Sequence, residues 1–429
     1  MYRSIAASTL ALTLLAAPAV AQPSPESPIA QHVPVGQGID GGERPEAAPE
    51  LSVGLFQDVL ERGESAQNSK DGTVTYYRLP RPAAGERLSI SAQLIVDPMR
   101  EPSSNRSIGL SAEIVGDTGN RCSGSETART SRNDIDRLAL VTLITERLEP
   151  ERDWPRSGCL ADPQGQPWLR IERTGEWQDD QPVPVELRLL REPAIDPTIL
   201  GEAVTEDMTP HAVQLTGEAT DVSGGTGFST ATALADGSIF ADSILPFETK
   251  YYKVHVAAGQ RLNYRVVMGD SREASARGVT VSTYNPLLED DLTLYAERSL
   301  RREDVSSFVT QNLATAVSPD LVESHGRYRS LSVPGDYYLM ISGDARDPRG
   351  LNPLKYEIAV ELTGQALNAT EWASQVQASA DSEAGIGAQN ASADTWVPDA
   401  GQLGALLGGV AVALGGYALW WLLRRRRHG

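Results

Sequence analysis

Residues 251–262 read YYKVHVAAGQRL and residues 76–88 read YYRLPRPAAGERL, so the chain carries two versions of one stretch. Both begin with a tyrosine pair and end with Ala-Gly, a polar residue and Arg-Leu. Glycine adopts positive φ without strain. Each copy therefore predicts a strand, a tight turn at Gly85 or Gly259, and a second strand.

The similarity extends in both directions along the chain. Upstream, GLFQD at 54–58 corresponds to GSIFAD at 237–242. Downstream, WLRI at 168–171 corresponds to YLMI at 338–341, and each is followed by a further apolar stretch. Two domains of ordinary size are therefore expected.

Apolar side chains in these copies recur at every second position. One such series is Leu88, Ile90, Ala92 and Leu94, and residues 356–362 repeat the pattern. This alternation is typical of strands with one face in a core and the other in water. Amphipathic helices longer than three turns are not expected, so the predicted fold class is mainly β.

The second copy resembles the bacterial pre-peptidase C-terminal domain, a β-sandwich of the jelly-roll type. The matching stretches are YYKVHVAAGQ at 251–260, DLTLY at 291–295, PGDYYLMI at 334–341 and YEIAV at 356–360. The first copy lacks clear counterparts of DLTLY and GDYY and contains two cysteines instead. The family occurs beside secreted peptidases or in surface proteins. Because the chain has no peptidase motif, the resemblance implies an accessory or binding fold without activity.

Residues 1–21 have a basic residue, a short apolar core and small residues before Gln22, as in a cleaved export signal. An uncleaved anchor is the alternative. The uncharged stretch 402–423 is long enough to span a bilayer. Four arginines open the tail 424–429 and favour a cytoplasmic C-terminus with the N-terminus outside. A buried core helix is the alternative for 402–423. This plan resembles that of actinobacterial surface proteins.

Composition divides the remaining chain into segments. We expect a disordered leader at 22–50, a first β-sandwich at 51–192, a linker at 193–227, a second β-sandwich at 228–364, and a stalk at 365–400. The leader is rich in Pro, Gly and Glu, and the linker ends in the glycine-rich 223–227.

Acidic residues outnumber basic ones, 57 to 38, giving a formal charge of −19. Nucleic-acid binding is excluded as a function, because phosphate contacts need a basic surface. Outside the cytoplasm, Cys122 and Cys159 are expected to form a disulfide. A catalytic or metal-bound thiol is the alternative, although neither cysteine lies in a C-x-x-C or histidine-rich context.

Motifs that would indicate catalysis, a cofactor or a metal site are missing from the sequence. It has no G-x-S-x-G, no H-E-x-x-H and no phosphate-binding loop. The acidic clusters at 289–291 and 344–347 lack the spacing of a calcium loop and favour turns. Adjacent tyrosines could form a carbohydrate platform, but neighbours in a strand point to opposite faces, so at most one of each pair is exposed.

Small residues line one face of the predicted span and allow close approach of a second helix. They are Gly404, Gly408, Ala411 and Gly415. Self-association in the membrane is one hypothesis. The ordinary abundance of glycine and alanine in such helices is the other.

The sequence thus predicts a non-enzymatic protein of the bacterial envelope that binds an envelope protein or glycan, or has a structural role. An envelope hydrolase, an accessory subunit of one, and a sensor acting through a transmembrane partner are the alternatives. A cleft with paired carboxylates of raised pKa would favour the hydrolase.

Overall fold

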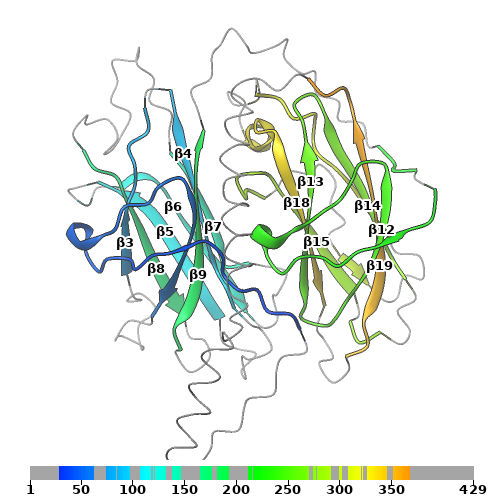
Figure 1. Ribbon diagram of the computed structural model, residues 1–429, viewed down its shortest axis with the longest axis horizontal. Helices are drawn as coiled ribbons and strands as arrows, with labels where there is room; N and C mark the ends of the chain where they lie inside the picture. Colours follow the sequence, from blue (N-terminus) through cyan, green and yellow to red (C-terminus); the bar gives the residue numbers. More distant parts are fainter. Residues whose placement is uncertain are drawn as a thin grey trace, which may run out of the picture.

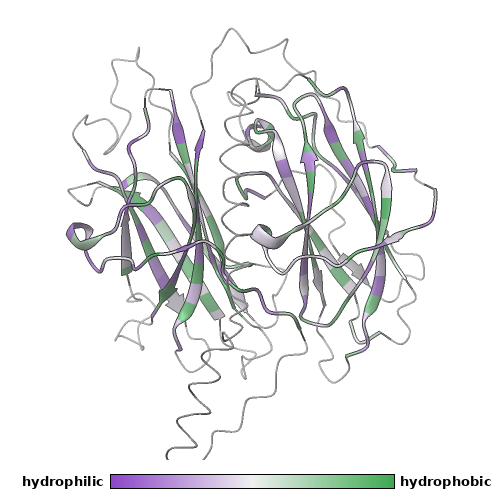
Figure 2. Ribbon diagram, in the orientation of Figure 1, coloured by the Kyte–Doolittle hydropathy of each residue, from purple (hydrophilic) through white to green (hydrophobic). Residues whose placement is uncertain are grey.

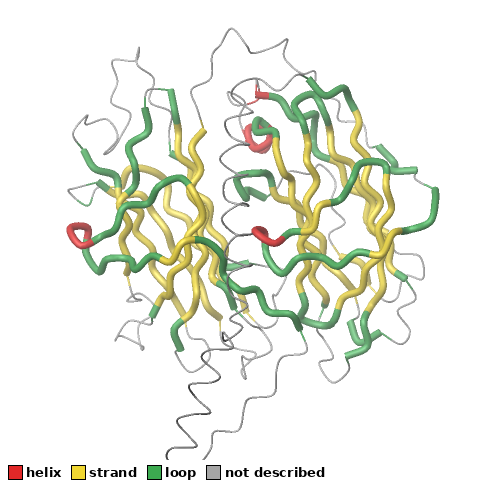
Figure 3. Tube along the Cα trace, in the orientation of Figure 1, coloured by secondary structure: helices red, strands yellow, loops and turns green. Residues whose placement is uncertain are grey.

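A computed structural model describes residues 29–61, 74–83, 85–96, 107–116, 119, 121–131, 138–145, 165–175, 181–192, 211–214, 216–269, 274–276, 278–290, 299–301, 308–319, 321, 326–344 and 351–367. This part of the chain is mainly β, with a few short 3-10 turns (Figure 3). They include η1 (Pro45–Ala47), η4 (Phe228–Thr230) and η6 (Gly326–Leu331).

The first half forms two sheets. One, the β2 sheet, has the order β1-β2-β9-β4-β7, and the other, the β3 sheet, has the order β3-β8-β5-β6. The strands are β1 (Gln37–Gly38), β2 (Gly54–Leu60), β3 (Val74–Arg78), β4 (Arg87–Leu94), β5 (Ser107–Val115), β6 (Arg121–Ser131), β7 (Leu140–Ile144), β8 (Trp168–Gly175) and β9 (Val183–Glu192).

The second half repeats this plan. The β12 sheet has the order β10-β12-β19-β14-β17, and the β13 sheet has the order β11-β13-β18-β15-β16. The strands are β10 (Thr220–Asp221), β11 (Thr232–Ala233), β12 (Ser238–Ile244), β13 (Thr249–Val256), β14 (Arg261–Met268), β15 (Gly278–Tyr284), β16 (Ser299–Arg301), β17 (Phe308–Asn312), β18 (Gly335–Gly343) and β19 (Leu354–Thr363).

The repeat expected from the sequence is therefore confirmed in strand order and in backbone detail. All five strands of the β2 sheet correspond in order to those of the β12 sheet, and the four strands of the β3 sheet correspond to β13, β18, β15 and β16. β1 and β10 both run parallel to their neighbours. The turn glycines Gly85 and Gly259 have φ of 81° and 82°. A side chain would be strained there, which explains why both copies keep glycine.

Each half encloses its own apolar core between its two sheets. Leu88, Ile90 and Leu187 are among the buried residues of the first core, and Leu262, Leu339 and Ile358 among those of the second. Hydrophobic and hydrophilic residues alternate along the strands that carry them (Figure 2). The series Leu88, Ile90, Ala92 and Leu94 of β4 faces the core as predicted, but the other face of this strand, which was expected in water, is also buried.

An aspartate fixes the segment that leads into each half. Asp58 Oδ2 accepts hydrogen bonds from the Tyr77 hydroxyl at 2.6 Å and from the Gly41 N–H at 2.9 Å. In the second half, Asp242 Oδ2 accepts from the Tyr252 hydroxyl at 2.6 Å and from the Gly224 N–H at 2.8 Å. Bonds to an ionised carboxylate are stronger than neutral ones. The leading segment of each half is therefore part of that half.

This arrangement corrects two expectations, that the leader is disordered and that the end of the linker is flexible. Residues 29–50, expected to be disordered, contain β1 and η1, and Gly42 bridges Tyr76. The last part of the expected linker contains β10, and in the glycine-rich stretch after it Gly225 bridges Tyr251 in the same manner. Composition suggested flexibility, but here glycine provides room. A Cβ on Gly224 would lie 2.8 Å from the Tyr252 ring.

Several expected segments fall outside the described residues. They are the signal at 1–21, the stretches 22–28 and 193–210, most of the stalk from 368, the span at 402–423, and the tail. Among the residues that the structure describes, no helix is long and apolar enough to cross a membrane.

Substituting Gly41→Ala tests the close approach of the first leading segment. A Cβ there would lie 2.0 Å from Thr75 Cγ2 and 2.9 Å from the Tyr77 ring. We expect a loss of about 1–3 kcal/mol in unfolding free energy, as for other overpacked sites, measured by urea denaturation. Gly38→Ala is the control, because no atom lies within 4 Å of its Cβ position. Equal losses in both variants would contradict the packing argument.

Candidate functional site: the junction between the sandwiches

The β2 sheet of the first sandwich lies against the β13 sheet of the second, so four sheets form consecutive layers (Figure 1). Arg188 Nη1 donates to the Pro286 carbonyl at 2.8 Å. The Thr142 hydroxyl donates to the Leu288 carbonyl at 3.1 Å. Leu190 of β9 packs with Leu287 from the second sandwich. The outer faces of these two sheets are therefore covered by each other; we call this contact the junction.

An aromatic cluster forms the apolar part of the junction. The Phe228 ring packs edge-on against Tyr251, Tyr284 and Tyr338, with centroid distances of 4.9, 5.0 and 5.3 Å. All four side chains are buried, together with Met340. Such edge-to-face pairs contribute beyond the area they bury, roughly 0.5–1.5 kcal/mol each.

This cluster explains the tyrosine pairs of the sequence. In β13, Tyr252 points into the sandwich core while Tyr251 points into the junction, and both are buried. Tyr337 and Tyr338 of β18 divide in the same way. Alternation predicts opposite faces correctly, but it does not reveal that a second sandwich covers the outer one.

A buried ion pair joins β4 and β9 of the β2 sheet. Arg87 Nε donates to Glu192 Oε1 at 2.6 Å, and the two side chains are 1% and 0% exposed. Glu289, from the second sandwich, accepts from Asn285 Nδ2 at 2.7 Å. Burial is the largest influence on Glu289 and raises its pKa above the ordinary value, although the nearby Arg87 opposes this. The junction thus contains charge that is costly to desolvate.

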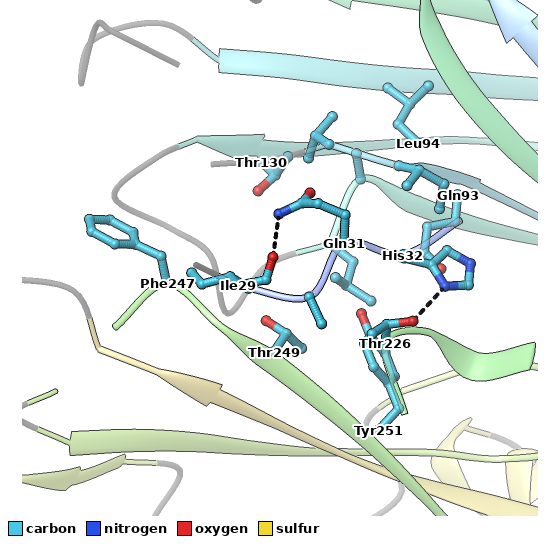
Figure 4. Close-up of a pocket in the computed structure, with 15 residues that line it drawn as sticks. Ile29, Gln31, His32, Gln93, Leu94, Thr130, Thr226, Phe247, Thr249 and Tyr251 are labelled. Carbon is cyan, nitrogen blue, oxygen red and sulfur yellow. Dashed lines mark hydrogen bonds between the residues drawn. The ribbon is translucent and has the colours of Figure 1, made fainter. Parts of the chain in front are cut away.

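A small cavity lies where the N-terminal strap, residues 29–36, enters between the sandwiches (Figure 4). Its volume is about 80 Å³ and its lining includes His32, Gln93, Thr226 and Tyr251. His32 Nε2 lies 2.9 Å from Glu186 Oε2, and His32 Nδ1 lies 3.3 Å from Thr226 Oγ1. The imidazole therefore joins the strap to both sandwiches.

Thr226, His32 and Glu186 place a hydroxyl, an imidazole and a carboxylate in the order found in a hydrolytic triad. The surroundings of the three groups decide whether they could act as one. A cavity of this volume holds about two or three waters and no acyl substrate. Glu186 also accepts from the Val35 N–H at 3.3 Å, and Thr226 shares its hydroxyl with Thr230. These contacts fit a structural role, in which His32 holds the strap to both sandwiches, better than the roles of a nucleophile and its base.

A larger groove lies on the second sandwich, across β12, β14 and β19. Its volume is about 650 Å³, within the range of ordinary ligand sites. Val222, Val267 and Met268 provide apolar surface, and Glu357 and Lys355 are charged. Sequence patterns gave no indication of this groove, because its residues come from four separate strands and their ends.

The residues singled out by the sequence do not meet in one site. Cys122 lies on β6 against the first core and is not a free thiol. Cys159 lies outside the described residues, so their pairing stays a prediction. Gly404, Gly408, Ala411 and Gly415 also lie outside them. His255 is exposed on β13, and its Nδ1 lies 3.1 Å from Asp336 Oδ1.

No protein-family model matches the chain, and no curated protein matches it. Among solved structures, the pre-peptidase C-terminal domain of collagenase from Bacillus anthracis is 12% identical with a TM-score of 0.19, and the match covers 34% of this chain and 99% of that domain. The tandem CBM22 domains of Xyn10C from Paenibacillus barcinonensis are 11% identical with a TM-score of 0.17, covering 73% and 92%.

A further match is the M60 catalytic domain with two CBM51 domains of ZmpB from Clostridium perfringens, 9% identical with a TM-score of 0.18, covering 68% of this chain and 33% of that one. Similarity at this level carries no argument about ligand, activity or source. The β-sandwich architecture stands on the strand order and the two cores.

Removing the Phe228 ring tests how much the aromatic cluster contributes to the stability of the junction. We expect Phe228→Ala to cost about 3–5 kcal/mol, the usual loss for a buried phenylalanine. Because the two cores are separate, we expect the variant to unfold in two calorimetric transitions and the native protein to unfold in one. Val59→Ala is the control, since Val59 is 52% exposed. An unchanged single transition in Phe228→Ala would show that the sandwiches do not depend on this cluster.

The buried carboxyl of Glu289 predicts a pH-dependent effect. A raised pKa in the folded state means that this group favours folding below its unfolded pKa and loses that contribution as pH rises through the folded value. Glu289→Gln keeps an acceptor for Asn285 and removes the charge. We expect a gain on the order of 1 kcal/mol at pH 7 and no gain near pH 4, from urea denaturation at both pH values. A loss at pH 7 would contradict this.

Proposed function

We propose that this chain is a non-enzymatic envelope protein whose two sandwiches form one rigid body, held outside a membrane by the C-terminal span and binding an envelope protein or glycan. The observation that carries the proposal is the junction. Domains joined only by a linker reorient freely. Here the apolar cluster, the hydrogen bonds of Arg188 and Thr142 across the junction, and the strap favour one fixed orientation, as a module that presents a surface requires.

The location follows from the two ends of the sequence. An export signal at 1–21 and a span at 402–423 with arginines after it place the folded part outside, and a Cys122–Cys159 disulfide suits that compartment. Association of spans through Gly404 and Gly408 would add a second level of assembly. The span could also couple a bound ligand to a transmembrane partner.

The positions of the carboxyl groups with raised pKa favour a binding role over hydrolysis. Among the described residues, burial raises the pKa of Glu126, Glu248 and Glu289. Each accepts a hydrogen bond from a neighbouring donor: the Thr142 N–H, the Leu245 N–H and Asn285 Nδ2. None of the three lines either the cavity or the groove described above. Carboxyls held in this way support the fold.

The proposed topology is tested with epitopes at two positions. One is inserted at 217–218, an exposed turn before β10, and the other follows Gly429. Protease added to intact spheroplasts should remove the first epitope and leave the second until the cells are lysed. Protection of the first epitope in intact spheroplasts would overturn the proposed location.

A further inference from the structure

The groove on the second sandwich has a counterpart on the first. Glu357 of β19 pairs with Val267 of β14, and Glu186 of β9 pairs with Gln93 of β4 at the same register. Their neighbours on the other side, in β12 and β2, also correspond. The internal repeat therefore allows the two patches to be compared position by position.

On the first sandwich this patch is covered by an extended segment. The strap places His32 Nε2 2.9 Å from Glu186 Oε2 and directs the Val35 N–H to the same oxygen. Tyr251, from the second sandwich, hydrogen-bonds Gln93. The glutamate of this patch thus contacts an imidazole and a main-chain donor, and apolar side chains lie beside that glutamate. Residues 29–36 are a built-in example of what this surface binds.

On the second sandwich, no segment among the described residues contacts Glu357 as the strap contacts Glu186. Glu357 is exposed, and the groove beside it has a volume of about 650 Å³. In the segment that leads into β10, His211 Nε2 lies 3.0 Å from Glu361 Oε2, so this histidine contacts a different glutamate of β19. Met268 and Val267 contribute apolar surface, while Asp221 and Glu357 outweigh Lys355 in charge. The groove is therefore apolar with an acidic rim.

We propose that this groove binds an extended polypeptide segment of a partner protein, in which a basic or histidine side chain lies beside apolar residues. The cationic group meets Glu357 as His32 meets Glu186, and the apolar residues cover Val267 and Met268. This inference rests on the proposed binding role and names its partner class.

A second copy of this chain fits the groove poorly. The junction is made partly by residues 226–231, and the bridges of Gly42 and Gly225 identify 43–48 as their equivalent in the first sandwich. Stacking of a second copy would bring that loop, with Glu43 and Glu46, towards the acidic rim. Like charges brought together disfavour the contact. The occupant is therefore a different, cationic chain.

Met268 provides a direct reporter of occupancy. The full chain, purified in a mild detergent with methyl-labelled methionine, is titrated with an eight-residue peptide of the sequence 29–36 in which lysine replaces histidine. We expect a saturable shift of the Met268 methyl signal, which Met268→Leu identifies by its loss. The Met340 methyl, buried in the junction, should not move. A peptide with glutamate in place of the lysine should bind several-fold more weakly.

Glu357→Gln should weaken the lysine peptide about threefold to fivefold, the effect of one exposed ion pair. Glu46→Gln, at an exposed acid outside the groove, is the matched control and should change nothing. No Met268 shift at millimolar peptide, or equal binding of the lysine and glutamate peptides, would overturn the proposal. The spheroplast experiment reports separately on location, so failure of one proposal is distinguishable from failure of the other.

Discussion

Burial of the outer face of the β13 sheet beneath the β2 sheet is the constraint on which the rest of the structure depends. Phe228 and its three tyrosine neighbours would form an exposed apolar patch on an isolated second sandwich, and such a patch promotes association. The first sandwich covers it. That contact sets the orientation of the halves, the path of the strap and the shape of the cavity around His32.

The same contact does not continue at the free end of the stack. At the position that Met340 occupies in β18, β8 of the first sandwich carries Arg170. Arg170 pairs with Glu113 at 3.1 Å and with Glu172 at 2.9 Å. A partly exposed ionic network replaces the apolar residues of the junction. Removing this ionic network from water would cost free energy and would oppose the stacking of a further sandwich on this face. The face at this end of the stack therefore carries charge.

The two halves thus share a framework and differ in what covers them. Asp58 and Asp242 hold equivalent tyrosines and leading segments, which preserves each sandwich. The strap covers the patch around Glu186, whereas in the part of the chain that the structure describes the patch around Glu357 borders a groove. This difference between two equivalent positions is what the proposed binding groove is argued from.

The sequence by itself determined the strands, the turn glycines and the repeat, because alternation and positive φ are local properties that neighbouring residues impose. It also predicted that Tyr251 and Tyr252 point to opposite faces. Only the tertiary structure decided that both are buried, that Gly224 lies against a tyrosine ring and is no free linker residue, and that His32 joins two sandwiches. These outcomes depend on residues far apart in the chain approaching within a few ångströms, and no local pattern records such distances.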